Sequence, residues 1–126
     1  MLRVYVAGQY SADNVIGVLR NMQRGMKAAE QIFSMGYAPF CPWHDYHYEL
    51  LADHPKGLYY AYSMAWLEVS DIVVLLEGWE NSPGTIAEKK RAEELGIPVM
   101  LFADFLGAHE RGELSDARSL DRRTVR

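Results

Sequence analysis

The sequence predicts a single α/β domain with a doubly wound parallel sheet of four to five strands. Short runs rich in β-branched residues alternate with segments of helical periodicity, as in strands joined by helical crossovers. The run IVVLL at 72–76 is continuously apolar, which is typical of a parallel strand covered on both faces. A chain of 126 residues is the size of one such domain.

The first strand is expected at 2–8, where a β-rich run ends in glycine. A helix follows over 12–35, and Asp13 or Asn14 can cap its N-terminus. Apolar residues at helical spacing define the expected inward face of this helix: Val15, Val18, Leu19, Met22, Met26, Ala29 and Phe33. Gly36 ends the helix, and YAPFCP predicts a short second strand.

Residues 43–57 are irregular and rich in aromatic side chains and histidines, and residues 58–69 are helical but apolar on nearly every side. A helix without a clear water-facing side is usually packed on two sides. In so small a domain, the second side predicts contact with another copy of the chain. We therefore expect a homo-oligomer, a dimer or higher, that forms through the helix 58–69.

The third strand is expected at 72–76 and the fourth at 97–102. Between them lies a helix with Ser82 as N-cap and Pro83 in its first turn, which ends before Gly96. After Phe102 the apolar pattern fades. The sequence therefore predicts a domain over 1–103 and a charged C-terminal tail over 104–126, either a surface helix or a disordered segment.

Composition excludes several classes of function. The net charge of −4 gives no electrostatic attraction to nucleic acid or to an anionic membrane. No apolar run reaches the length of a bilayer span, and the first residues lack the anatomy of a signal peptide. The single cysteine, Cys41, cannot form an internal disulfide and suits a reducing compartment. We expect a cytoplasmic protein without nucleic-acid or membrane partners.

Two polar turns, AGQYSADN and EGWENSPGT, follow the first and third strands and precede helices. Ligands of such sheets bind at this edge, and helix N-termini there suit a phosphate or carboxylate. Gly8 permits close approach to the backbone, and Ser11, Ser82 and Thr85 add hydroxyl groups. Neither turn has the spacing of a Walker A or dinucleotide motif. A structural alternative remains, in which Ser82 only caps its helix and Thr85 only packs.

Glu88 lies on the inward side of the helix that begins at Pro83, in line with Ala92 and Leu95. A carboxylate near a helix N-terminus gains about 0.3–1 kcal/mol, so a capping role is an alternative. Capping, however, needs no inward-facing position. A carboxylate directed into the crevice suits an oxocarbenium-like reaction at a sugar C1′. The spacing S-x-G-x-x-x-E places a hydroxyl and this carboxylate within reach of one substrate.

The segments VYVAGQYS, PFCP and SDIVVLLEGWENSPGTIAEKKRAEELGIPV together resemble the nucleoside 2-deoxyribosyltransferase-like superfamily over about residues 2–102. The resemblance implies a flavodoxin-like fold and chemistry that needs no metal or organic cofactor. It also implies that Glu88, in the motif G-x-x-x-E, is the nucleophile and that Tyr5 belongs to the active site. A serine at position 82 matches the branch of 2′-deoxynucleoside 5′-monophosphate N-glycosidases, whereas transferases usually have an aspartate there.

The chain departs from this family at Ser63, where members commonly carry an aspartate that orients the sugar or transfers a proton. Acid assistance to the departing base would then come from elsewhere, with His44, Asp45 and His47 as candidates. Alternatively, the activity is weak, different or lost. The spacing His-Asp-x-His is not a recognised zinc pattern, so no metal site is expected.

We therefore expect cleavage of, or transfer across, the N-glycosidic bond of a nucleotide or nucleoside, with a deoxynucleoside 5′-monophosphate favoured. Glu88 and Tyr5 are the expected catalytic residues. The expected substrate-binding residues are Gly8, Tyr10, Ser11, Trp79, Ser82, Gly84 and Thr85. Trp79 is the best candidate for stacking on the base. The alternatives are a weak or inactive nucleotide-binding module on the same fold and, ranked lower, a phosphoribohydrolase of the Lonely Guy type, which has paired glycines that this chain lacks.

Overall fold

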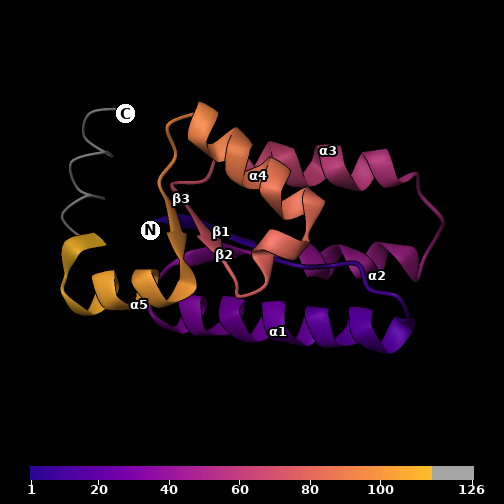
Figure 1. Ribbon diagram of the computed structural model, residues 1–126, viewed down its shortest axis with the longest axis horizontal. Helices are drawn as coiled ribbons and strands as arrows, with labels where there is room; N and C mark the ends of the chain where they lie inside the picture. Colours follow the sequence, from indigo (N-terminus) through magenta and orange to yellow (C-terminus); the bar gives the residue numbers. More distant parts are fainter. Residues whose placement is uncertain (115–126) are drawn as a thin grey trace.

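The computed structural model describes residues 1–114. Within them, four parallel strands form one sheet in the order β2-β1-β3-β4 (Figure 1). The strands are β1 (Arg3–Ala7), β2 (Ala38–Phe40), β3 (Ile72–Leu75) and β4 (Val99–Leu101). The predicted doubly wound parallel α/β fold is confirmed, with the lower of the two expected strand numbers in the described part of the chain.

Helices cover both faces of this sheet. They are α1 (Val15–Ser34), α2 (Tyr46–Glu49), α3 (Lys56–Leu67), α4 (Pro83–Glu94) and α5 (Phe102–Glu110), with short 3-10 helices η1 (Pro42–Asp45) and η2 (Trp79–Asn81). Figure 1 shows α1 and α5 on one side of the sheet and α3 and α4 on the other. In residues 1–114, no helix is long and apolar enough to cross a bilayer.

Alternation along the strands divides the core into two clusters. Val4 and Val6 of β1 point toward α1 and α5, whereas Tyr5 and Ala7 point toward α3 and α4. All four side chains are fully buried. Tyr5 thus reaches the face of the sheet on which α4 carries Glu88.

Helix α1 begins as the sequence predicts but buries a different face. The side chain of Asn14 caps it by accepting a hydrogen bond from the Gly17 amide at 2.8 Å. The prediction is wrong for four of the seven expected inward residues, since Val15, Leu19, Met26 and Phe33 are exposed. The buried residues are Gly25, Ala28, Ala29 and Ile32.

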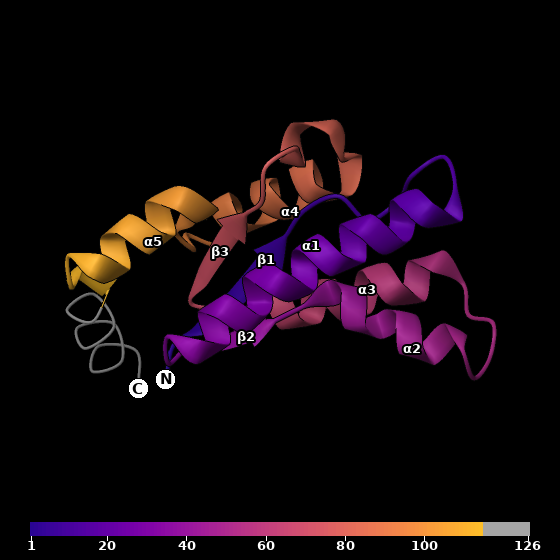
Figure 2. The same ribbon diagram turned by 90° about the horizontal axis from the view of Figure 1, so that it is seen from below.

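The small side chains of this face explain the difference. A Cβ atom at Gly25 would lie 2.3 Å from the ring of Trp43, so the helix backbone packs directly on that indole. Figure 2 shows α1 lying across β1 and β2. Close approach of the backbone, rather than the largest apolar stripe, therefore decides the orientation of α1.

Helix α5 follows β4 and packs against β3 and β4. Phe105 is fully buried, and Ala108 and Leu114 join the same core cluster. The predicted division of the chain at residue 103 stays a prediction. Residues 115–126 of the predicted tail lie outside the described residues.

The strand order places a switch in winding beside β1. The chain passes from β1 to β2 on one side and later to β3 on the other side. Ligand crevices of doubly wound sheets lie at this point, beyond the carboxyl ends of the strands. The segments that meet there follow β1, β2 and β3.

Candidate active site

A cavity of about 330 Å³ lies at this edge of the sheet. Its volume is at the lower end of the range of small-molecule sites. Four parts of the chain supply its walls: the loop after β1, the segment with η1 and α2, the first two turns of α3, and the N-terminal half of α4. The lining residues are Gly8, Tyr10, Ser11, Pro42, Trp43, Asp45, Glu49, Lys56, Tyr59, Tyr60, Ser63, Ser82, Gly84, Thr85 and Glu88.

Glu88 is half-buried in the cavity wall and accepts a hydrogen bond from the Tyr5 hydroxyl through Oε2. It shares the inward side of α4 with Thr85 and Ala92, which are buried. Leu95, which the sequence predicts on the same stripe, is the C-cap of α4 and is exposed. The inward position of Glu88 therefore serves the contact with Tyr5 at the cavity.

Burial shifts the acidity of both members of this pair. It raises the pKa of Glu88 to about 7, and the hydrogen bond from Tyr5 partly opposes that rise. Burial also raises the pKa of Tyr5 well above its usual value, and the neighbouring Glu88 adds to the effect. Tyr5 consequently stays protonated at neutral pH, whereas Glu88 exchanges its proton in the physiological range.

The N-terminus of α4 is tied to the loop after β1. Ser82 caps the helix, because its Oγ accepts the Thr85 amide at 3.2 Å. The buried Thr85 hydroxyl lies 2.9 Å from the Gly8 carbonyl oxygen and 2.9 Å from the Ser82 hydroxyl. The capping and packing roles are thus present, and both side chains also line the cavity. At Gly84, a Cβ atom would meet only the Ser82 hydroxyl, at 4.0 Å, which leaves the backbone there open to a ligand.

The opposite wall holds a second tyrosine–carboxyl pair. The Tyr10 hydroxyl donates to Asp45 Oδ1 at 2.9 Å, and Asp45 is only 7% exposed. Burial raises the pKa of the Asp45 carboxyl, while the hydrogen bond from Tyr10 lowers it. His44 and His47 are exposed and do not line the cavity. Among residues 1–114, no three His, Cys, Asp or Glu side chains gather as metal ligands would.

Residues 2–101 match the sequence profile of the family described as a domain of unknown function (DUF4406). The chain belongs to the DUF4406 family. No curated protein sequence matches it significantly. Among solved structures, it is similar to a 2-deoxyribosyltransferase from the psychrotolerant bacterium Bacillus psychrosaccharolyticus, with a TM-score of 0.54 and 18% sequence identity, over 79% of this chain and 70% of that chain. At this identity the likeness shows the fold. It confirms the predicted flavodoxin-like fold, which this chain shares with that 2-deoxyribosyltransferase.

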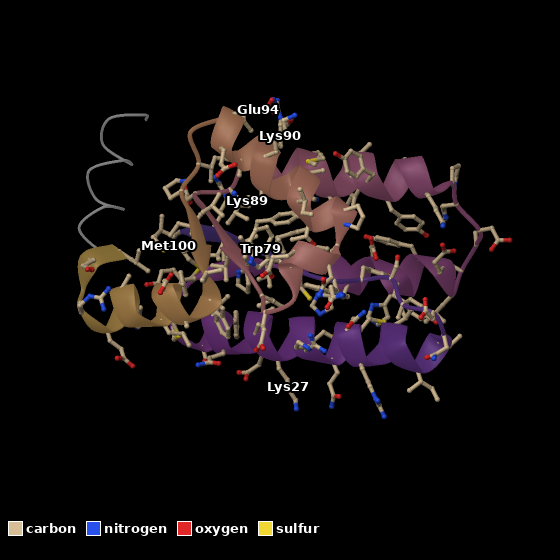
Figure 3. All side chains as sticks on the ribbon, viewed as in Figure 1. Lys27, Trp79, Lys89, Lys90, Glu94 and Met100 are labelled. Carbon is tan, nitrogen blue, oxygen red and sulfur yellow. The ribbon has the colours of Figure 1, made fainter. Side chains whose placement is uncertain are left out.

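In this DUF4406 chain, Trp79 is the predicted binding residue that the structure does not bring to the cavity. The turn after β3 needs a glycine at position 78, where φ is 88°. The following η2 directs the Trp79 ring onto the core cluster beneath α3 and α4. The Lys89 ammonium lies 5.7 Å from the centroid of this ring, and Figure 3 labels both side chains. Trp79 is therefore close to Glu88 in the sequence but does not line the cavity with it.

Sequence reasoning missed the wall that α2 and α3 provide. Lys56, Tyr59 and Tyr60 line the cavity together with Glu49. The Tyr59 hydroxyl is buried and makes no hydrogen bond of normal length within residues 1–114, although Glu49 lies near enough to raise the pKa of Tyr59. The sequence feature that could have predicted this wall is the aromatic run LYYAYS at 58–63, which follows Lys56 and Gly57. Its aromatic residues were assigned to a subunit contact, whereas one of the two sides faces the cavity.

Proposed function

We propose that this DUF4406 protein cleaves the N-glycosidic bond of a nucleotide or nucleoside, or transfers the sugar to another base. A deoxynucleoside 5′-monophosphate is the favoured substrate. The observation that carries the proposal is the Glu88 carboxyl group, which lies at the cavity and is held by the Tyr5 hydroxyl. The fold of a 2-deoxyribosyltransferase supports the same class of reaction.

In the proposed reaction, the ionised Glu88 attacks C1′ of the sugar, and the bond between C1′ and the base nitrogen breaks. Water then attacks C1′ and releases the sugar from Glu88, or a second base does so. Tyr5 holds the carboxylate in place and keeps its pKa from rising further. Glu88 must lose its proton to act, so activity should increase as pH rises through about 7.

The N-terminus of α4 is the proposed place of the phosphate. The Thr85 hydroxyl has one proton, which it donates to the Gly8 carbonyl, so Ser82 donates its own proton to Thr85 in the empty site. We propose that the Ser82 hydroxyl turns from Thr85 to a phosphate oxygen when substrate binds. The open backbone at Gly84 and the partial positive charge of the helix end favour an anion there. Lys56 is the cation in the cavity lining. Gly8, Tyr10 and Ser11 are proposed to contact the remainder of the substrate.

A second candidate is a nucleotide-binding module with weak or no turnover, and Ser63 favours it. Its side chain is buried in the cavity wall, close enough to Tyr5 to lower the pKa of that hydroxyl. A serine hydroxyl is too weak an acid to protonate a departing base. Binding without base release would distinguish this candidate.

The test is release of free base from a panel of ribo- and deoxyribonucleosides and their 5′-monophosphates. Wild type and Glu88→Ala are compared with and without an acceptor base. Base release that the variant loses supports the glycosidase, and new nucleosides formed only with acceptor support transfer. If wild type releases no base while a nucleotide raises its melting temperature, the binding module is correct.

We also propose that the chain forms a homo-oligomer through α3. Leu58, Trp66 and Val69 are 55%, 48% and 50% exposed on this helix and its C-terminal turn. Large apolar side chains gathered on one surface favour a subunit contact. Light scattering after gel filtration measures the mass in solution, and Trp66→Glu should shift it toward the monomer. A wild-type protein that elutes as a monomer at high concentration would contradict the proposal.

A further inference from the structure

Asp45 is a second carboxyl group in the cavity, and only one of its two oxygens has a partner within the described residues. It occupies the N-cap position of α2, yet its side chain makes no capping hydrogen bond. Oδ1 accepts the Tyr10 hydroxyl at 2.9 Å. Within the described part of the chain, Oδ2 makes no hydrogen bond and Asp45 forms no salt bridge. Among the described residues, the Tyr59 hydroxyl alone is a buried side-chain oxygen or nitrogen without a partner, so Oδ2 of Asp45 is accessible from the cavity and free to contact a ligand.

The strand order places the two carboxyl groups on opposite sides of β1. Asp45 comes from η1, which follows the edge strand β2, whereas Glu88 comes from α4, which follows β3. Tyr5, in β1 between them, donates to Glu88, and the charge of Asp45 raises its pKa. The two carboxyl groups therefore flank the carboxyl end of β1 within electrostatic reach of the same hydroxyl.

A substrate placed as proposed fills this space in one direction. Its phosphate lies at the N-terminus of α4 and its C1′ lies at Glu88, one helical turn further along. The base then extends toward the wall that remains, formed by η1 and α3. Asp45 and the buried hydroxyl of Tyr59 belong to that wall.

Resting on this proposed function, we propose that Asp45 is the proton donor to the departing base. As Glu88 forms its bond to C1′, the electron pair of the bond between C1′ and the base moves to the base. The protonated Asp45 gives its proton to a nitrogen or oxygen of the base, which leaves as a neutral molecule. Asp45, now ionised, then accepts a proton from the water that attacks C1′ and displaces Glu88. Both carboxyl groups return to their initial states, and one water is consumed per bond cleaved.

The surroundings of Asp45 shift its pKa in both directions. Burial raises it, the hydrogen bond from Tyr10 lowers it, and the charge of Glu49 of α2 raises it. The other titratable neighbours are Tyr5, Cys41, Tyr59 and Tyr62, which are neutral at physiological pH and whose own pKa values the charge of Asp45 raises. A bound base removes more water from Asp45, while positive charge at C1′ favours the ionised form of Glu88.

The deciding experiment compares leaving groups that differ in their need for a proton. The first substrate is 2′-deoxyguanosine 5′-monophosphate, from which guanine leaves with the help of an acid. The second is its 7-methyl derivative, whose base already has a positive charge and leaves as neutral 7-methylguanine without an acid. Asp45→Asn should lower kcat/KM about 10²–10⁴-fold on the first nucleotide and less than about tenfold on the methylated one. If wild type acts on pyrimidines only, 2′-deoxyuridine 5′-monophosphate and its 5-nitro derivative replace this pair, since the nitro group stabilises the departing base.

Asp53→Asn is the matched control. Asp53 is an exposed acidic residue of the same segment that does not line the cavity, so it should leave both rates at the wild-type level. Equal loss on both nucleotides in Asp45→Asn, or no loss on either, would overturn the role of Asp45 and leave the glycosidase intact. A wild type that releases base from neither the purine pair nor the pyrimidine pair overturns the glycosidase and Asp45 together.

Tyr10→Phe is the second variant, in case Asp45→Asn fails to fold. It keeps the Asp45 carboxyl but removes the hydrogen bond that lowers its pKa. Because Asp45 must be protonated to act, the loss of kcat/KM at alkaline pH should move to higher pH. If the alkaline limb of the kcat/KM profile stays in place in Tyr10→Phe, or moves to lower pH, Asp45 is not the proton donor.

Discussion

The two tyrosine–carboxyl pairs of the cavity are alike in chemistry and different in setting. Tyr5 and Glu88 join β1 to α4 beneath the cavity, and Tyr5 is fully buried in the core. Tyr10 and Asp45 join a loop to η1, and Tyr10 is only partly buried. The first pair is fixed by the sheet, whereas the second depends on loops. This difference suits a nucleophile that must be placed accurately and an acid that must reach different bases.

Removing the carboxyl of the first pair should have the largest effect. Glu88→Ala should lower the rate of base release by at least about 10⁴, because no other carboxyl reaches the same position. Release of free base, followed by chromatography, measures the effect. Glu80→Gln, an exposed carboxyl in the turn before α4, is the control and should keep the wild-type rate. Substantial base release by Glu88→Ala would show that the reaction does not depend on this pair.

Removing only the hydrogen bond of the first pair should have a smaller effect with a defined sign. Tyr5→Phe should lower kcat/KM about 10–100-fold. The Tyr5 hydroxyl lowers the pKa of Glu88, which is about 7 in the wild type. The acidic limb of the pH profile should therefore move to higher pH in the variant. An unchanged limb would indicate that Glu88 is not the group that titrates.

The third prediction concerns the packing of α1 on Trp43, next to the Tyr10–Asp45 pair, and it is tested by substitution of Gly25. Gly25→Ala places a Cβ atom 2.3 Å from the present position of the Trp43 ring, and we expect a loss of about 1–3 kcal/mol in the free energy of unfolding. Gly57→Ala is the matched control, since nothing lies within 4 Å of its Cβ position. Urea denaturation measures both. Equal stability of the two variants would show that α1 can move away from Trp43 at little cost.

The last effect, similar in size to that of Gly25→Ala, is on stability and depends on pH. The pKa of Glu88 rises from 4.5 to about 7 on folding. The folded state therefore binds more protons over this range, and the contribution of Glu88 to stability falls as pH increases from about 4.5 to 7. Glu88→Gln should stabilise the protein by about 1–3 kcal/mol at pH 8 and hardly at all near pH 4, after allowance for partial exposure. Thermal unfolding at the two pH values measures the difference. A gain of equal size at both would mean that the charge of Glu88 does not cause it.

The wall with Glu88 was readable from the sequence because local rules build it. Ser82 caps the helix that Pro83 begins, and the spacing to Glu88 fixes which side of α4 it occupies. The alternation of β1 likewise sends Tyr5 to the face that α4 covers. The catalytic and binding roles of these residues stay predictions.

The wall with Asp45 was not readable in the same way. Its residues come from η1, α2 and α3, and only tertiary packing brings them together. The same reason explains why the predicted inward face of α1 is wrong and why Trp79 packs away from the cavity. The small residues of α1 face inward because the helix backbone packs on Trp43. The positive φ of Gly78 sets the direction in which the chain enters η2. Neither contact leaves a periodic trace in the sequence.

The Thr85 hydroxyl, which links α4 to the Gly8 carbonyl, has a consequence for redesign. It couples the two segments on the Glu88 side of the cavity, so exchange of one segment without the other should disturb the reacting centre. Residues 42–62 stand outside this link and supply the surface proposed to face the base. We expect that new base preferences can be sought in that segment by loop exchange, while the part of the fold that positions C1′ is retained.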